Sequence, residues 1–191
     1  DLKYQLDAIS SICDVFEGQE TCSTNFSVPK LNSFKESEKQ ISLFGDDVQA
    51  GEQLSIDEEI KDMGVGNKLS LLPEELQKNI QMIQLKNGLP QIESISSMNF
   101  TVEMETGTGK TYVYLRSVFE LNKKYGFTKF IIVVPSIAIK EGVFKSLEIT
   151  QEHFKSIYDN VCYDYFVYDS QKLGQVRSFA TNDNIQIMVI N

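Results

Sequence analysis

The stretch FTVEMETGTGKTYVYL, residues 100–115, constrains the fold of this chain more than any other feature. Its apolar start predicts a strand over 100–104, its glycines predict a loop over 105–109, and the run from Lys110 predicts a helix. A glycine-rich loop between a strand and a helix surrounds an anion with backbone N–H groups at the positive end of the helix dipole. The stretch therefore predicts a phosphate-binding loop in an α/β fold.

The loop residues have separate expected roles. Glycines let the backbone close around phosphate, Lys110 can reach the β and γ phosphates of a nucleotide, and the Thr111 hydroxyl can ligate Mg²⁺. Lys110 and Thr111 are the catalytic candidates, and a simple glycine turn with a solvated lysine is the alternative. The residues expected to contact the nucleotide are Thr106, Gly107, Thr108, Gly109, Lys110 and Thr111.

The rest of the second half alternates between strand-like and helix-like segments. Strands are expected over 129–134, 163–168 and 185–190, with helices between them. Such alternation predicts that these strands and 100–104 form one parallel sheet covered by helices on both faces, with residues 105–111 at its carboxyl edge. The apolar run FIIVV indicates that the strand over 129–134 is buried on both faces.

The first 99 residues are organised differently. An amphipathic helix is expected within 1–18 and a second helix over 73–87. Between them, residues 19–70 are polar, serine-rich and acidic without sustained periodicity, which predicts an excursive or poorly ordered loop. An acidic surface for a basic partner is the alternative interpretation. The expected parts are the helix over 1–18, a long polar acidic insertion with its following helix over 19–99, and an α/β lobe over 100–191.

Charge, cysteine content and hydropathy limit the class of protein. Of 27 acidic and 18 basic residues, 17 and 8 lie within 1–99, so the net charge of −9 belongs to that half and does not exclude a nucleic-acid partner. Three cysteines and one histidine without CxxC spacing predict neither a disulfide framework nor a zinc site. No apolar run approaches the roughly 20 residues of a membrane helix. The charged, helix-like segment that begins at Asp1 does not have the pattern of a signal peptide. We expect a cytoplasmic protein without a membrane partner.

Met104 stands where the pattern GxxxxGK(S/T) has its first glycine, and this resembles the first motif of superfamily 2 helicases and translocases. VVPS resembles their motif that contacts the nucleic-acid backbone, and KYQLDAI resembles their adenine-binding segment. The resemblance implies that Tyr4 and Gln5 contact the base and that Pro135 and Ser136 lie on the DNA track. A plain strand-to-helix turn and an uninformative Tyr-Gln pair are the alternatives for these two motifs.

A closer resemblance covers residues 100–191 and YQLDAI near the start. These segments look like the N-terminal motor region of the restriction (Res) subunit of type III restriction-modification enzymes, whereas 19–70 matches least well. The resemblance implies a RecA-like P-loop NTPase lobe in an ATP-dependent DNA translocase and endonuclease subunit. It further implies ATP and Mg²⁺ as cofactors, and double-stranded DNA and a modification (Mod) methyltransferase subunit as partners.

The same resemblance implies that much of the catalytic machinery lies beyond residue 191. Such subunits continue into an acidic Walker B-type motif, a second motor lobe and a nuclease domain, so the 191 residues alone are expected to be inactive. Two alternatives remain open from the sequence. One is another superfamily 2 motor, such as a type I restriction motor or an RNA helicase, and the other is a phosphate-binding module without turnover.

Overall fold

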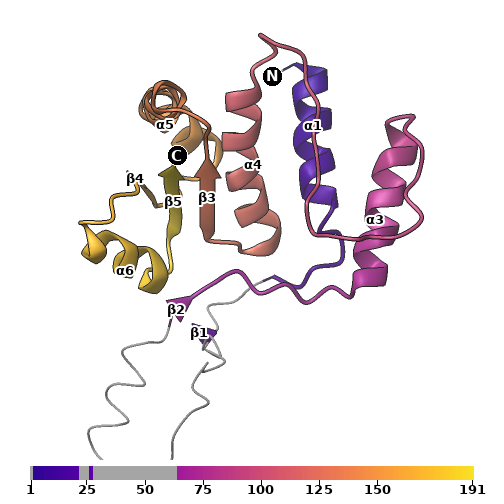
Figure 1. Ribbon diagram of the computed structural model, residues 1–191, viewed down its shortest axis with the longest axis horizontal. Coiled ribbons are helices and arrows are strands. Elements are labelled where there is room, and N and C mark those ends of the chain that lie inside the picture. Colours follow the sequence, from indigo (N-terminus) through magenta and orange to yellow (C-terminus); the bar gives the residue numbers. More distant parts are fainter. Residues whose placement is uncertain (1, 22–25, 28–63) are drawn as a thin grey trace, which may run out of the picture.

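The computed structural model describes residues 2–21, 26–27 and 64–191 (Figure 1). Within these residues a short antiparallel strand pair, β1 and β2, accompanies a three-stranded parallel sheet and five helices. The helices are α1 (Lys3–Asp14), α3 (Pro73–Lys86), α4 (Lys110–Tyr125), α5 (Ile137–Ile157) and α6 (Leu173–Thr181). The strands are β1 (Phe26–Ser27), β2 (Gly64–Val65), β3 (Lys129–Val133), β4 (Tyr163–Val167) and β5 (Ile185–Ile190). The α/β class predicted from the sequence is confirmed.

The parallel sheet has the order β3-β5-β4, so the last strand along the chain is the central one. Lys129 of β3 pairs with Gln186 of β5, and Tyr163 of β4 pairs with Ile185. Helix α5 connects β3 to β4, and α6 connects β4 to β5. Three of the four predicted parallel strands are thus present, and the βαβ organisation is the one that the alternating pattern predicted.

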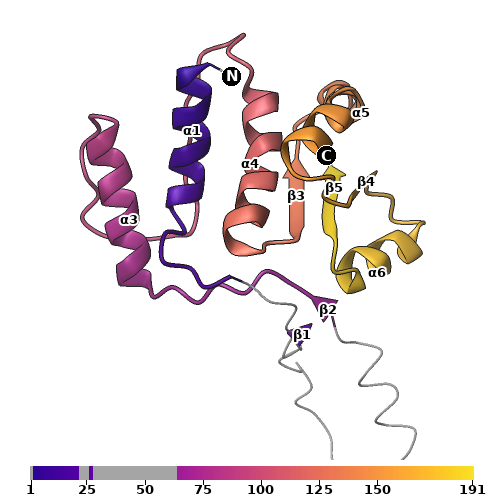
Figure 2. The same ribbon diagram turned by 180° about the vertical axis from the view of Figure 1, so that it is seen from behind.

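The fourth predicted strand, over 100–104, is not formed. The segment belongs to the long connection that leads from α3 past α1 to the start of α4 (Figures 1 and 2). Phe100 is 44% exposed and Val102 is 47% exposed, while Met104 packs against the core of α1 and α4. A strand needs a hydrogen-bonded neighbour, and no strand of the described part pairs with this segment. The apolar side chains of residues 100–104 are therefore not enough to make this segment a strand.

The burial predicted for β3 is also wrong. Ile131 is 55% exposed and Val133 is 74% exposed, whereas Phe130 and Ile132 pack against the buried core. In the described part of the chain β3 pairs only with β5, so it is an edge strand with one face covered. An apolar groove of about 300 Å³ lies between α4 and β3. The groove is lined by Ile12, Tyr114, Ser117, Val118, Leu121, Phe130, Ile131 and Ile132.

Among the described residues, side-chain hydrogen bonds cover the outer edge of β3 only at its beginning. The amide of Asn67 accepts from the N–H groups of Thr128 and Lys129 at 2.8 and 3.0 Å and donates to the Lys129 carbonyl at 2.7 Å. Alternate residues of a strand direct their backbone groups to opposite edges. The Thr128 carbonyl and the Val134 N–H bond to β5, so the backbone groups of Ile131 and Val133 face outward.

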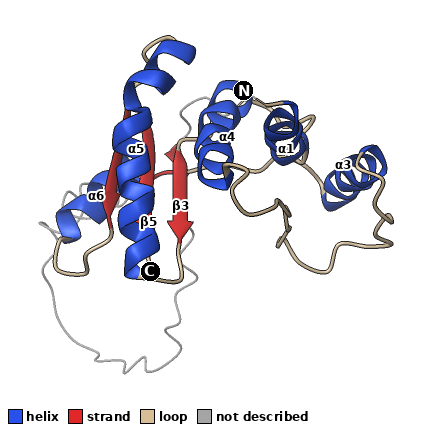
Figure 3. Ribbon diagram, turned by 90° about the horizontal axis from the view of Figure 1, so that it is seen from above, coloured by secondary structure: helices blue, strands red, loops and turns tan. Residues whose placement is uncertain are grey.

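The main core lies between α4, α5 and the sheet. Leu115 and Phe119 of α4 and Leu147 and Phe154 of α5 are fully buried, and their apolar spacing follows the helical period. Helix α5 is one continuous helix of 21 residues. Figure 3 shows α4, α1 and α3 in a row beside the sheet. Because α1 packs directly on α4, it lies close to the predicted phosphate loop.

Most of the predicted polar insertion, residues 22–25 and 28–63, lies outside the described residues. The residues that flank it are held together. The buried Gln19 side chain accepts from the Ser70 N–H at 2.9 Å and donates to the Lys68 carbonyl at 3.0 Å. These hydrogen bonds fix the chain at the two ends of the insertion. The expectation of poor order over 19–70 is therefore not met at Gln19, Lys68 and Ser70.

Candidate functional site

The loop before α4 has the backbone geometry that the glycines predicted. Gly107 has a φ of +82° and Gly109 a φ of +85°. Residues other than glycine rarely adopt such positive φ angles. The first backbone hydrogen bond of α4 runs from the Val113 N–H to the Gly109 carbonyl at 3.0 Å. The N–H groups of residues 110–112 therefore precede the helical ladder and are available, together with the helix dipole, to an anion.

The loop lies at the carboxyl edge of the parallel sheet, which agrees with the prediction. Helix α4 and strand β3 run in opposite directions and are joined by residues 126–128, so the start of α4 lies at the same end as the carboxyl end of β3 (Figure 1). Open α/β sheets bind their ligands at this edge. Gly126, with a φ of +71°, closes the other end of α4.

Lys110 is folded across the loop. Its Nζ donates to the carbonyl of Met104 at 3.1 Å and to the carbonyl of Glu105 at 2.8 Å, and the Thr108 hydroxyl donates to the same Glu105 carbonyl at 2.7 Å. Hydrogen bonds to a charged acceptor are stronger than those to a neutral carbonyl. A phosphate entering the loop can therefore draw the exposed Lys110 ammonium away from these carbonyls.

Gln5 contacts the loop directly although 103 residues separate it from Thr108. Its Nε2 donates to the Thr108 carbonyl at 3.0 Å, and its Oε1 accepts from the Leu2 N–H at 3.2 Å. Tyr4, the preceding residue of α1, is 45% exposed, so its ring is open to solvent. The sequence placed Gln5 beside the base of a nucleotide, and the contact with the loop backbone was not predicted.

Pro135 and Ser136 lie where β3 leads into α5, on the same side of the sheet as the loop (Figure 1). Ser136 is the N-cap of α5, and its Oγ accepts from the Ile139 N–H at 3.3 Å. Pro135 is exposed. Serine is among the residues that most often cap a helix in this way. Within the described residues no hydrogen bond joins Ser136 to the glycine loop.

Sequence reasoning missed the residues that hold α1 against its neighbours. Asp14 contacts Lys124 of α4 at 3.3 Å and Lys86 of α3 at 3.9 Å, and it accepts from the Ser10 hydroxyl at 2.8 Å. Burial lowers the pKa of Lys124, but the hydrogen bond and charge of Asp14 outweigh this effect and raise it overall. The only signal in the sequence is an acidic residue at the end of a helix, which does not identify its partners.

A second missed cluster connects α4 to α5. The Tyr158 hydroxyl donates to Glu120 at 2.7 Å and accepts from Arg116 at 3.3 Å, and the Tyr112 hydroxyl lies 3.0 Å from His153 Nε2. Burial and then the Glu120 carboxylate raise the pKa of Tyr158, and Arg116 opposes the rise. These contacts fix α4, and therefore the loop at its start, relative to α5.

The part of the chain that the structure describes offers the loop no cluster of three or more histidine, cysteine or carboxylate side chains that could hold a metal ion. The Thr111 hydroxyl lies in the first turn of α4. Of the described residues, Thr111 could ligate a magnesium ion there together with oxygens of a nucleotide, because Mg²⁺ retains several waters and binds with its phosphate ligand.

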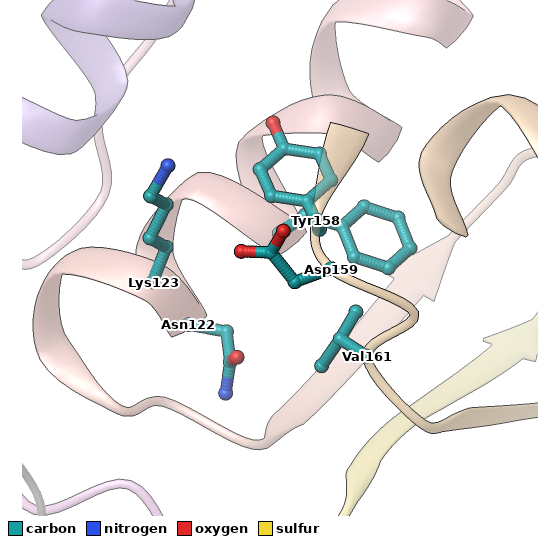
Figure 4. A pocket seen from close by; sticks show the side chains of 6 residues that line it. Asn122, Lys123, Tyr158, Asp159 and Val161 are labelled. Carbon is teal, nitrogen blue, oxygen red and sulfur yellow. The ribbon is translucent and has the colours of Figure 1, made fainter. Parts of the chain in front are cut away.

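A hollow of about 130 Å³ lies away from the loop, at the last turn of α4 (Figure 4). Asn122 and Lys123 of α4 line one side, and Asp159 and Val161 from the turn after α5 line the other. Because α4 begins at the loop and this hollow is at its far end, the hollow is not part of the candidate site.

Among the described helices, none is long and apolar enough to cross a membrane.

Comparison with known proteins identifies the family. The model of the family described as "Type III restriction enzyme, res subunit" matches residues 73–191, which is more than half of the chain. The chain belongs to this Res subunit family. The matched region contains the phosphate loop and the start of α5, whereas Tyr4 and Gln5 precede it. The resemblance to the Res subunit found in the sequence is therefore confirmed.

Individual Res subunits show the same relationship. The EcoPI Res subunit of Escherichia phage P1 is 37% identical over 116 residues, which are 58% of this chain and 12% of that protein. The EcoP15I Res subunit of Escherichia coli is 36% identical over 113 residues, again 12% of that protein. The StyLTI Res subunit of Salmonella typhimurium is 53% identical over 64 residues, 6% of its length. The matched part of the chain thus spans about one eighth or less of each relative.

Proposed function

We propose that this chain is the ATP-binding part of an ATP-dependent DNA translocase and endonuclease subunit in a type III restriction-modification system. One observation carries the proposal: in a member of the Res family, the glycine loop lies at the start of α4 and at the carboxyl edge of the sheet, with Lys110 across it. Parallel α/β sheets bind nucleotides at that edge, and helix starts bind phosphate.

In this proposal the loop holds the phosphates of ATP. The backbone N–H groups of Thr106, Gly107, Thr108 and Gly109 and the start of α4 surround the phosphate chain, and Lys110 neutralises charge on the β and γ phosphates. Thr111 ligates magnesium, which when bound offsets the negative charge that develops during phosphoryl transfer. Tyr4 supplies a stacking face for the base, and the Gln5 amide supplies a donor and an acceptor.

DNA would contact the chain at the start of α5. Pro135 and Ser136 lie on the same side of the sheet as the loop, and the Ser136 hydroxyl retains its proton for a phosphate oxygen while its oxygen caps the helix. The restriction-modification names of the relatives support double-stranded DNA and a Mod methyltransferase subunit as partners. Site recognition would then belong to the Mod subunit.

The test is ATP hydrolysis by the intact subunit, assembled with its Mod partner and given duplex DNA. Lys110→Ala should reduce phosphate release about 100-fold or more, because positioned charges stabilise the transition state. Lys123→Ala is the matched control, since it removes an exposed lysine from the other end of the same helix. Unchanged turnover in Lys110→Ala would exclude the loop as the ATP site.

A further inference from the structure

We propose that Gln5 is a positioning residue for the phosphate loop, so that it strengthens binding of the phosphate chain whatever base the nucleotide carries. The inference rests on the proposed function and extends it. Its first support is the hydrogen bond from Gln5 Nε2 to the Thr108 carbonyl, at 3.0 Å. Thr108 lies between the two glycines of the loop, so this bond holds the segment whose N–H groups would surround phosphate.

The orientation of the Gln5 amide is determined by its partners. The Thr108 carbonyl can only accept and the Leu2 N–H can only donate, so the amide nitrogen must face the loop and the amide oxygen must face Leu2. The exchanged orientation would oppose two acceptors on one side and two donors on the other. The contact is therefore a specific bond between α1 and the loop.

Gly109 shows that the loop and the amide are in close contact. A Cβ atom built on Gly109 would lie 2.6 Å from Gln5 Nε2, closer than two such atoms can approach. The same construction at Gly107 meets no heavy atom within 4 Å. Both glycines have positive φ angles, but only at Gly109 would an added side chain also displace the Gln5 amide from the loop. The close approach links the glycine pattern of the loop to a residue in another helix.

Helix α1 is a firm platform for this contact. At its far end the Cys13 carbonyl accepts from the Tyr125 hydroxyl at 3.0 Å, and Asp14 pairs with Lys124 at 3.3 Å. Between the two ends Ile9 packs against Val113 of α4. A group fixed in this way orders its partner before the ligand arrives, and this reduces the entropy lost on binding.

Positioning the loop leaves Gln5 able to contact a base as well. An amide nitrogen carries two N–H groups and an amide oxygen carries two lone pairs, and one of each is used here. A contact to the base affects ATP and GTP differently, whereas an effect on the loop extends to a ligand that has no base. Inorganic tripolyphosphate is such a ligand.

The experiment measures the affinities of ATP, GTP and tripolyphosphate for the intact subunit by calorimetric titration. Gln5→Met keeps the length of the side chain but removes both hydrogen bonds, and Gln175→Met is the matched control at an exposed position of α6. We expect Gln5→Met to weaken binding of all three ligands by roughly three- to tenfold, because of the two lost bonds only the one to Thr108 reaches the loop. Gln175→Met should change none of them.

A double-mutant cycle gives a second readout that does not depend on how well Gln5→Met folds. Gly109→Ala suffers from its positive φ in either background, but it clashes with the amide only when Gln5 has its full length. Gly109→Ala should therefore weaken tripolyphosphate binding more in the parent than in a Gln5→Ala background. Equal losses in the two backgrounds would contradict the proposed contact.

The outcomes separate the inference from the function on which it rests. If the parent binds tripolyphosphate, Lys110→Ala does not, and Gln5→Met binds it normally while losing only the preference for ATP, then the positioning role is wrong and the ATP site stands. If the parent binds none of the three ligands, or if Lys110→Ala binds them as the parent does, the ATP site is wrong and the inference is rejected with it.

Discussion

Lys124 lies 3.3 Å from Asp14, and this ion pair fastens the last turn of α4 to the last turn of α1. Asp14 also contacts Lys86 at 3.9 Å, so one carboxylate connects three helices. Asp14→Asn should lower the free energy of unfolding by about 1 kcal/mol or less, because the lysines are partly exposed and such pairs are weak. Thermal unfolding at low and high salt measures this change in the free energy of unfolding. The change should be smaller at high salt, because salt screens the ion pair.

The matched control is Asp7→Asn, which removes a carboxylate that pairs with the exposed Lys3 of its own helix. An equal loss of stability in both variants would show that the contacts between helices contribute nothing beyond a local ion pair.

The N-cap of α5 allows the helix-capping role of Ser136 to be separated from DNA contact. Ser136→Ala should lower stability by about 1 kcal/mol because the Ile139 N–H loses its acceptor. Ser136→Asp retains an acceptor but brings a negative charge to the proposed DNA track, so it should keep the stability and weaken DNA binding by the intact complex. DNA binding that is normal in Ser136→Asp would remove Ser136 from the track.

Cys13 predicts a dependence of stability on alkaline pH. Burial raises the pKa of its thiol from 9.0 to about 11. The folded state then binds a proton that the unfolded state releases above pH 9, so stability is full below pH 9 and is lost as the pH rises toward 11. The slope contributed by one such group is up to about 1.4 kcal/mol per pH unit.

Urea unfolding over this pH range measures the slope. Cys13→Ala should lose less stability between pH 9 and 11 than the parent does, although its stability at neutral pH falls. Cys162→Ala, which removes an exposed thiol, should retain the slope of the parent. Tyr163, whose pKa burial raises to about 12, acts in the same direction and remains in all three proteins. A slope unchanged by Cys13→Ala would contradict the assignment.

The 191 residues alone are proposed to hydrolyse no ATP. Phosphoryl transfer needs groups around the γ phosphate from several sides, and an arginine finger alone contributes roughly 10³ to 10⁵ in rate. The described residues provide the loop, Lys110 and Thr111. Phosphate release by the purified chain with Mg²⁺, ATP and duplex DNA should equal that of Lys110→Ala. Release that Lys110→Ala abolishes would show that the chain is catalytically sufficient.

The sequence predicted those parts of the fold that depend on local chemistry. The helix expected over 73–87 is present as α3, and the glycines marked the turn before α4. Each of these signals acts within a few residues, through backbone angles or through the period of a helix. Such features can be predicted from the sequence of the segment that adopts them.

The features that the sequence did not predict depend on neighbours distant in the chain. The apolar pattern of residues 100–104 is that of a strand, but a strand exists only beside another strand. The apolar run of β3 does not reveal that it is an edge strand with Ile131 and Val133 uncovered. At the candidate site, the glycines and Lys110 are visible in the sequence, whereas the bond between Gln5 and Thr108 spans 103 residues and has no local signature.

The open edge of β3 has a consequence for producing this chain by itself. Outward-facing backbone groups beside the exposed side chains of Ile131 and Val133 form a template on which a strand of another molecule can add. In the part of the chain that the structure describes, Asn67 blocks that template, and it does so at Lys129 alone. Concentrated preparations should therefore be prone to aggregation, and a lysine at position 133 would act as a gatekeeper, because a charge on an edge strand opposes intermolecular pairing.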